Sequence, residues 1–267
     1  MRVAVVGHVE WVSFFGIDQP IHPGAIVRAE PGVEEAAGGG GVAAVELARL
    51  AGASTLFTAL GDDAIGHGVV PALEALGVEV RAEMRSEPQR RAITVVDPEG
   101  ERTIVVIGPA QAPPAARVDV DGFDCVYLCK GDVAVVRRAR SARVLCATAR
   151  ILPVLQEAGV ELDVLVHSAN DPSERYRPGE LDPAPRLVAT TEGGAGGRFH
   201  THEGVSGRWA AAPLDGPTID TYGAGDSFAA ALGFAVARGD TVDEALAFAA
   251  SRGAAALSRR GAHGSLV

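Results

Sequence analysis

Short apolar runs alternate with longer segments of helical period along most of this 267-residue chain. The apolar runs predict buried strands at residues 2–6, 55–59, 125–128, 143–146, 164–167 and 187–189. The segments of helical period predict helices at 42–51, 65–76, 133–140, 151–158, 224–238 and 242–259, the last of them capped by Thr241. Such alternation predicts an α/β fold, in which helices cover both faces of a mostly parallel sheet. The length suits a single domain over residues 1–267.

Two regions interrupt this alternation. Residues 92–96 and 103–107 are rich in β-branched side chains and are joined by Asp97-Pro98-Glu99-Gly100, a turn sequence that predicts a hairpin. Residues 11–33 lack a helical period and contain three prolines. Together, the segments at about 11–33 and 91–107 predict a small antiparallel sheet that projects from the main domain. From the residues alone, this sheet is equally a lid over a site or a plain extension of the edge.

The composition argues against two classes of partner. A net charge of −10 and a pI near 5.2 do not suit a nucleic-acid surface. The N-terminal apolar run meets His8 and Glu10 too early for a signal peptide, and no run approaches the length that spans a bilayer. We therefore expect a cytoplasmic protein with no nucleic-acid partner and no membrane partner.

Cysteine and histidine spacing adds little chemistry. The spacing of the cysteines matches no metal or disulfide pattern, so reduced thiols in the core are the favoured interpretation. The residues are Cys125, Cys129 and Cys146. A metal cluster is one interpretation of His200, His202 and Glu203. Because no further ligand stands at a useful spacing, a surface location is favoured for them.

The stretch DTYGAGDSFAAAL, residues 220–232, places a carboxylate at the start of an apolar helix. The first turn of a helix has N–H groups without intrahelical partners, and Gly223 and Gly225 would let a phosphate-sized anion approach them. Capping of the helix by Asp226, Ser227 or Asp220 is the alternative. The helix dipole should hold Asp226 ionised and make it a weak base. A weak base is sufficient for phosphoryl transfer, which has a loose transition state.

DTYGAGDSF resembles the signature Asp-Thr-x-Gly-Ala-Gly-Asp-x-Phe of the ribokinase-like (PfkB-type) carbohydrate and nucleoside kinases. Further stretches resemble family motifs in the same order: GGGGVAAVELARLAG (38–52), TALGDDAIG (58–66), DPEGERT (97–103), TEGGAGG (191–197) and RRGAHGS (259–265). The resemblance implies a three-layer ribokinase-like domain with a β-sheet lid. It also implies transfer of phosphate from ATP to a hydroxymethyl group of a sugar or sugar-like molecule. The P-loop sequence GxxxxGK[ST] is absent.

The resemblance also assigns roles at the reacting centre. Asp226 would be the base that takes the proton of the acceptor hydroxyl. The N–H groups of Gly223, Ala224 and Gly225 would form the anion hole. The nucleotide would be bordered by Thr191, Gly193 and Gly196.

Two cations follow from the same resemblance. The family's Asn-x-x-Glu, which helps to hold Mg²⁺ through water, aligns with Ser168 and Asp171, with Asn170 and Glu174 as near alternatives. Whether Asp171 or Glu174 replaces the family's glutamate is left open. A monovalent cation, which we expect to be K⁺, would be held by Asp220, Tyr222, Ala256, Arg259, Gly261 and Ser265.

The acceptor pocket departs from that of ribokinases proper. Glu10, Gly38 and Gly39 would border the acceptor together with Asp226. The family's sugar-binding Asn, Asp and Asn are replaced by Glu10, Val12 and Ala43. Because buried polar matches carry specificity, these losses argue against D-ribose.

Three functions therefore stay open. A sugar kinase is the first, and a nucleoside kinase, with Trp11 or a lid residue stacked on the base, is the second. The third is a non-catalytic ligand sensor, although a sensor would have no need of Asp226. An exposed sheet edge usually needs cover, so a homodimer through the lid is a further expectation.

Overall fold

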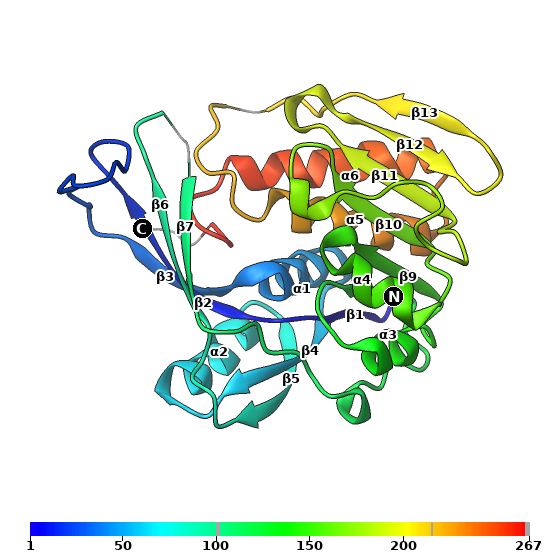
Figure 1. Cartoon of the computed structure of the whole chain (residues 1–267), viewed down its shortest axis with the longest axis horizontal. Coiled ribbons are helices and arrows are strands. Elements are labelled where there is room, and N and C mark those ends of the chain that lie inside the picture. Colours follow the sequence, from blue (N-terminus) through cyan, green and yellow to red (C-terminus); the bar gives the residue numbers. More distant parts are fainter. Residues whose placement is uncertain (100–101, 215, 265–267) are drawn as a thin grey trace.

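The computed structural model describes residues 1–99, 102–214 and 216–264. Within them the chain forms a nine-stranded sheet and a separate four-stranded sheet (Figure 1). The larger sheet has the order β13-β12-β11-β10-β9-β8-β1-β4-β5. Its strands are β1 (Val3–Val6), β4 (Ser54–Gly61), β5 (Val78–Arg85), β8 (Cys125–Leu128), β9 (Val144–Thr148), β10 (Val164–Ser168), β11 (Leu187–Thr191), β12 (Gly197–Thr201) and β13 (Ser206–Trp209). Every neighbouring pair from β11 to β5 is parallel, which confirms the predicted mostly parallel sheet.

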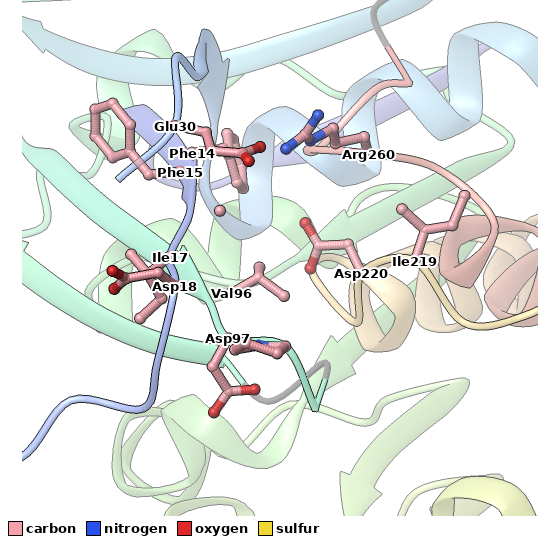
Figure 2. Close-up of a pocket in the computed structure, with 12 residues that line it drawn as sticks. Phe14, Phe15, Ile17, Asp18, Glu30, Val96, Asp97, Ile219, Asp220 and Arg260 are labelled. Atoms are coloured by element: carbon pink, nitrogen blue, oxygen red, sulfur yellow. The ribbon is translucent and has the colours of Figure 1, made fainter. Parts of the chain in front are cut away.

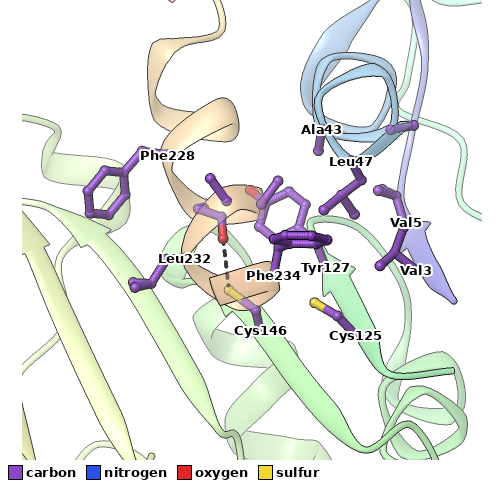
Figure 3. Close-up of a cluster of buried hydrophobic side chains, with 14 of the residues drawn as sticks. Val3, Val5, Ala43, Leu47, Cys125, Tyr127, Cys146, Phe228, Leu232 and Phe234 are labelled. Carbon is purple, nitrogen blue, oxygen red and sulfur yellow. Dashed lines mark hydrogen bonds between the residues drawn. The ribbon is translucent and has the colours of Figure 1, made fainter. Parts of the chain in front are cut away.

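Helices cover both faces of this sheet and give the predicted three layers. One face carries α1 (Gly38–Ala51), α2 (Ala64–Glu74), α5 (Ala224–Arg238) and α6 (Val242–Leu257); the other carries α3 (Val133–Ala139) and α4 (Leu152–Ala158). Successive residues of β1 serve the two cores in turn. Val3 and Val5 pack toward α1 and α5, and Ala4 and Val6 pack toward α3 and α4. Figure 3 shows part of the core that lies against α1 and α5.

The four-stranded sheet is the predicted lid, and it stands at one side of the main domain (Figure 1). Its order is β3-β2-β6-β7, formed by β2 (Glu10–Gly16), β3 (Val33–Ala37), β6 (Arg91–Val96) and β7 (Arg102–Ile107). The hairpin of β6 and β7 is antiparallel, as predicted, although Gly100 of its turn lies outside the described residues. The central pair β2–β6 is parallel, so the expectation of a wholly antiparallel sheet is wrong. The reason is that the chain crosses through β4, α2 and β5 between these strands.

Some element boundaries differ from the sequence pattern. α1 begins at Gly38 rather than at residue 42, with Gly38 at a φ of 75°. A Cβ on Gly40 would lie only 2.5 Å from the carbonyl oxygen of His8. Glycine disfavours helices by propensity, but this close approach requires it. α6 ends at Leu257, two residues early, and its start carries the predicted cap from Thr241, completed by Glu244.

The apolar core also accounts for the cysteines. Cys125, Cys129 and Cys146 are free and buried, as predicted. Burial raises the pKa of Cys125 to about 12, so this thiol is inert at neutral pH. In the part of the chain that the structure describes, no helix is long and apolar enough to span a membrane.

Candidate active site

The site is built around the start of α5. Gly223 occupies the N-cap position with a φ of 73°, and a Cβ there would lie 2.8 Å from Val42. Among the described residues no side chain caps this helix, so the capping alternative for Asp226, Ser227 or Asp220 is wrong. A Cβ on Gly225 would meet no atom within 4 Å, so open space lies in front of the helix start. Free N–H groups that face open space suit an anion.

Asp226 lies in the first turn of α5 and is largely surrounded by protein. The hydroxyl of Tyr127, in β8, donates a hydrogen bond to its Oδ1 atom at 3.0 Å. Removal from water raises the pKa of Asp226, although the Tyr127 hydrogen bond and the charges of Arg150 and His8 oppose this. The helix dipole alone would lower the pKa of Asp226. The pKa is raised instead, because desolvation outweighs the other influences. Asp226 is therefore a stronger base than the sequence indicated.

Glu10, Gly38 and Gly39 adjoin Asp226, as the resemblance implied. A Cβ on Gly39 would lie 3.0 Å from Oδ1 of Asp226, and one on Gly38 would lie 3.0 Å from Cγ of Glu10. The N–H group of Gly38 is already used, because it donates to the hydroxyl of Tyr222 at 3.0 Å. Only small residues fit between the two carboxylates.

Glu10 is held in place by two basic side chains. Nε of Arg90 donates to its Oε1 atom at 2.6 Å, and Nε2 of His8 lies 3.5 Å from the same oxygen. Burial raises the pKa of Glu10, but the hydrogen bonds and charges of His8 and Arg90 outweigh it, so the net pKa is lowered. Glu10 is therefore an ionised hydrogen-bond acceptor close to Gly38.

Arg150 draws two carboxylates together, and its charge also influences Asp226. It lies in the short 3-10 helix η2 (Ala149–Ile151), and its Nη2 atom is 3.2 Å from Oδ2 of Asp171 and pairs with Glu174. Both carboxylates belong to the segment around η3 (Pro172–Glu174). Asp171 uses its Oδ1 atom to cap this turn at Ser173. Glu174 is the more buried, with 15% of its side chain exposed against 38% for Asp171.

The negative charge of Asp226 affects the pKa of Glu174. Burial raises the pKa of Glu174, Arg150 opposes that effect, and Asp226 and Asp171 add to it. Carboxylates that repel one another in this way suit a divalent cation, which would relieve the repulsion and which prefers oxygen ligands. This donor set fits Mg²⁺ that arrives with a nucleotide. No group of three or more His, Cys, Asp or Glu side chains arranged for a metal occurs within residues 1–99, 102–214 and 216–264, the stretch from His200 to Glu203 included.

The remaining residues assigned to the nucleotide lie at the same edge of the sheet. Ser168 ends β10 and pairs in register with Thr191, which ends β11. The hydroxyl of Ser168 accepts from the N–H groups of Asn170 and Asp171 and so shapes the loop that carries the carboxylates. Gly193 and Gly196 follow Thr191 with φ values of 63° and 82°. Ligands in open parallel sheets bind beyond the carboxyl ends of the strands, which is where these residues meet.

The loop before α5 meets the end of α6. The N–H groups of Ile219 and Asp220 both donate to the carbonyl of Leu257, and Ala256 accepts from Arg259. Asp220 is buried, and its Oδ1 atom accepts from the N–H of Tyr222. A buried carboxylate beside backbone carbonyls fits a monovalent cation. Gly261 lies farther along, against Glu35 of β3, and Ser265 falls outside the described residues.

A cavity of about 360 Å³ opens next to Asp220, between the lid and this loop (Figure 2). Phe14, Asp97 and Arg260 are among the residues that line it. Arg260 reaches toward the lid, since a Cβ on Gly16 would lie 3.3 Å from its Nη2 atom. Arg260 thus brings a fixed positive charge into the cavity that Asp220 also borders.

Several residues of the site were missed by the sequence analysis. Tyr127 lies in an apolar strand with no sign of a polar role, and Arg150 directly precedes the helix predicted at 151–158. Arg102 of the lid donates to the hydroxyl of Thr221 at 3.0 Å and so ties β7 to the loop before α5. Trp11 lies on the opposite face of β2 from Val12, and its Nε1 atom donates to Glu34, so this arrangement gives no support to the stacking on a base that was left open for it.

Comparison with known proteins decides the family. The model of the pfkB family of carbohydrate kinases matches residues 1–156 and 161–267. The chain belongs to the pfkB family of carbohydrate kinases. The ATP-dependent ribose-1-phosphate kinase of Halopiger xanaduensis is similar to this pfkB kinase, with 28% identity over 286 residues, 98% of this chain and 94% of that protein.

Solved structures share the fold of this pfkB kinase at low identity. Ribokinase from Thermotoga maritima has a TM-score of 0.79 and 19% identity, over 100% of this chain and 96% of that one. Ribokinase from Arabidopsis thaliana, complexed with ribose and ATP, has a TM-score of 0.76 and 21% identity, over 99% and 95%. A nucleoside kinase from Methanocaldococcus jannaschii has a TM-score of 0.77 and 16% identity, over 100% and 95%. The ribokinase-like fold is thus confirmed.

Proposed function

We propose that this pfkB kinase transfers the γ-phosphoryl group of ATP to the hydroxymethyl group of a sugar or sugar-like acceptor. The observation that carries the proposal is Asp226, a desolvated carboxylate at the uncapped and open start of α5. A base with a raised pKa takes a proton more readily near neutral pH than an ordinary carboxylate does. The acceptor lies between Glu10, Gly38, Gly39 and Asp226.

The residues divide the work of the transfer. The oxygen of the acceptor forms a bond to the γ-phosphorus while the bond from that phosphorus to ADP breaks, and the proton of the hydroxyl passes to Asp226. The N–H groups of Gly223, Ala224 and Gly225 stabilise the charge on the transferring group, a contribution of about 3 kcal/mol for each well-placed donor. Thr191, Gly193 and Gly196 border the nucleotide.

Two cations complete the proposal. Mg²⁺ bound with ATP supplies charge neutralisation, and Ser168, Asp171 and Glu174 form the protein side of its site. K⁺ would be held by the side chain of Asp220 and by the segments that carry Tyr222, Ala256, Arg259, Gly261 and Ser265. Bound there, K⁺ would stiffen the loop that leads into the anion hole.

The acceptor is a sugar whose binding does not depend on the hydroxyl contacts of ribokinases. Val12 and Ala43 are fully buried and apolar, so neither can bind a sugar hydroxyl. Similarity to the ribose-1-phosphate kinase favours a second candidate, a pentose 1-phosphate that still carries a free hydroxymethyl group. Arg90 and Arg150 give the neighbourhood of Glu10 and Asp226 the positive charge that an anionic acceptor needs. A nucleoside is the weaker alternative, because Trp11 is not placed to stack on a base.

A screen of ATP consumption tests this function. The panel contains free pentoses and hexoses, pentose 1-phosphates and nucleosides, each with wild-type protein and with Asp226→Asn. We expect turnover with a sugar or a sugar 1-phosphate and a loss of about 10³-fold in the variant. No turnover on any member of the panel would support a ligand sensor instead. Turnover restricted to nucleosides would overturn the acceptor class and keep the chemistry.

A further inference from the structure

Tyr127 stands in an unusual place for a polar group. β8 lies inside the sheet between β1 and β9, and Tyr127 pairs there with Val5 and Cys146. The side chain is 1% exposed and lies among apolar side chains from the strands, α1 and α5 (Figure 3). Phenylalanine would pack there without a polar group to satisfy. A buried hydroxyl is tolerated only with a partner, and the partner of Tyr127 is Oδ1 of Asp226 at 3.0 Å.

This contact gives Asp226 one fixed oxygen. Of the described residues, Tyr127 is the one that donates a side-chain hydrogen bond to Asp226. It contacts Oδ1, and no described residue contacts Oδ2 by a hydrogen bond. The carboxylate cannot rotate without breaking the contact with Tyr127. The two oxygens therefore have different tasks, since one is held by the sheet and the other is left for the acceptor.

We propose that Tyr127 is the positioning residue of the base: its hydroxyl holds Oδ1 of Asp226 so that Oδ2 accepts the proton of the acceptor hydroxyl. The inference rests on the proposed function and adds a residue that DTYGAGDSF does not contain. Tyr127 does not touch the acceptor and acts through Asp226 alone. It transmits the rigidity of the central sheet to the side chain on which proton transfer depends.

The electrostatics point the same way. The groups that face Asp226 come from each element around it: Tyr127 and Cys129 from β8 and its end, His8 and Glu10 from the β1–β2 connection, Arg150 from η2, Glu174 near η3 and Tyr222 before α5. Desolvation is the largest influence and raises the pKa of Asp226. The Tyr127 hydrogen bond is the largest influence that lowers it. Without this hydroxyl, the pKa of Asp226 would be higher. Asp226 would then stay protonated to a higher pH and could not act as a base below it.

Tyr127→Phe in the full chain tests the proposal. The substitution keeps the ring and removes only the hydroxyl. We expect kcat to fall about 10-fold, because the lost hydrogen bond is one to a charged group. We expect KM for ATP and for the acceptor to stay within about 2-fold, since neither ligand touches Tyr127. The acid limb of the pH profile of kcat/KM should move to higher pH by about one unit.

A matched control and a second background separate this role from a general packing effect. Tyr176→Phe removes another tyrosine hydroxyl of the buried core, on the far face of the sheet, and should keep the wild-type pH profile. In the Asp226→Asn background, Tyr127→Phe should cause no further loss of activity. Placement of difluorotyrosine at position 127 strengthens the donor and should move the acid limb to lower pH.

The outcomes are distinct. A wild-type kcat and an unmoved acid limb in Tyr127→Phe would overturn the positioning role. If Asp226→Asn still lost activity in that case, the proposed kinase function would stand. If Tyr127→Phe does not fold, the difluorotyrosine protein decides, because an unmoved acid limb there also overturns the role. Absence of turnover by the wild-type protein would instead count against the proposed function itself.

Discussion

Asp226 lies where a carboxylate is costly to the fold. Its pKa in the folded protein is raised, chiefly by desolvation, so the ionised form destabilises the folded state. The cost is absent below the pKa of the unfolded chain, near 3.9 for aspartate, and grows as the pH rises through the folded value. This cost to the fold supports our proposal that the charge of Asp226 serves the reaction.

Asp226→Asn should therefore stabilise the protein while it removes activity. At pH 7.5 we expect the free energy of unfolding to rise by about 0.5–2 kcal/mol, because the amide keeps the hydrogen bond from Tyr127 and carries no charge. The difference should shrink as the pH falls toward 4. Urea unfolding of both proteins across this range measures it. A variant less stable than the wild type at pH 7.5 would contradict the electrostatic account of Asp226.

At the scale of single residues, the sequence predicted the site residues that lie within one local motif. It missed the residues that reach the site from distant parts of the chain. Gly223, Gly225 and Asp226 are recognisable because their spacing places them at one helix start. Tyr127 is 99 residues away from Asp226, in a strand whose pattern is purely apolar. Arg150 meets Glu174 only because β9 and β10 are parallel neighbours. Neither pairing leaves a trace in the local sequence.

At the scale of elements, η3 distinguishes the two carboxylates that we propose for Mg²⁺. Asp171 is committed to capping its own turn, whereas Glu174 is more buried and feels the charge of Asp226. The resemblance aligned Asp171 with the family's glutamate, and the geometry favours Glu174. Asp171 and Glu174 are three positions apart. An oxygen of Asp171 accepts hydrogen bonds from Ser173, whereas Glu174 pairs with Arg150.

Glu174→Gln should lower kcat by about 10-fold or more and raise the Mg²⁺ concentration needed for half-maximal activity. Asp171→Asn is the matched control and should be milder, since the amide oxygen can still cap the turn at Ser173. Titration of kcat with Mg²⁺ for both variants is the measurement. A larger effect from Asp171→Asn would reverse the assignment and support the aligned pair.

The loop before α5 gives a second prediction at this scale. K⁺ should stimulate turnover severalfold relative to a bulky organic cation at equal ionic strength, because Asp220 and the end of α6 would hold it. Asp220→Asn should remove most of that stimulation. Equal rates of the wild type in K⁺ and in tetramethylammonium would mean that the cation assignment is wrong. In that case the guanidinium of Arg260, which lines the neighbouring cavity, would supply the positive charge beside Asp220.

In the nine-stranded sheet, the prediction succeeded for the strands that are apolar throughout and failed for the strands toward its two ends, which carry charged or exposed residues. β8 matched its predicted bounds because a strand that is buried on both faces is apolar throughout. β5, with the sequence VEVRAEMR, lies at the edge of the sheet and is half exposed, so its charges hid it. β12 and β13 also carry polar, partly exposed residues, so the sequence pattern did not predict them as strands. Local propensity could not reveal the parallel pairing of β2 with β6, which depends on a long crossover.

At the scale of the whole molecule, the lid carries an uncovered apolar surface. β7 is an edge strand with every residue exposed, and its apolar side chains Ile104, Val105, Val106 and Ile107 are 39–50% exposed. Such an edge can pair with the same strand of a second copy about a two-fold axis. We propose on this basis that the lid forms a homodimer.

Substitution of Val105 tests the dimer. Sedimentation of the wild type should show a dimer at micromolar concentration, and Val105→Lys should shift it to a monomer, because a charge on the apolar edge opposes pairing. Val205→Lys is the matched control, since Val205 is 56% exposed in the turn between β12 and β13, on the main sheet rather than the lid. A monomeric wild type, or equal dissociation by both variants, would contradict the lid interface.

The most direct measurement of the central claim locates the transferred phosphate. The acceptor with the highest turnover is incubated with ATP, and the product is examined by ³¹P NMR with proton coupling. We predict a phosphate monoester on the hydroxymethyl carbon with the wild-type protein. Under the same conditions, with ATP binding retained, we predict about 10³-fold less product with Asp226→Asn. Equal product from both proteins, or ADP formation that does not depend on an acceptor, would contradict the role assigned to Asp226.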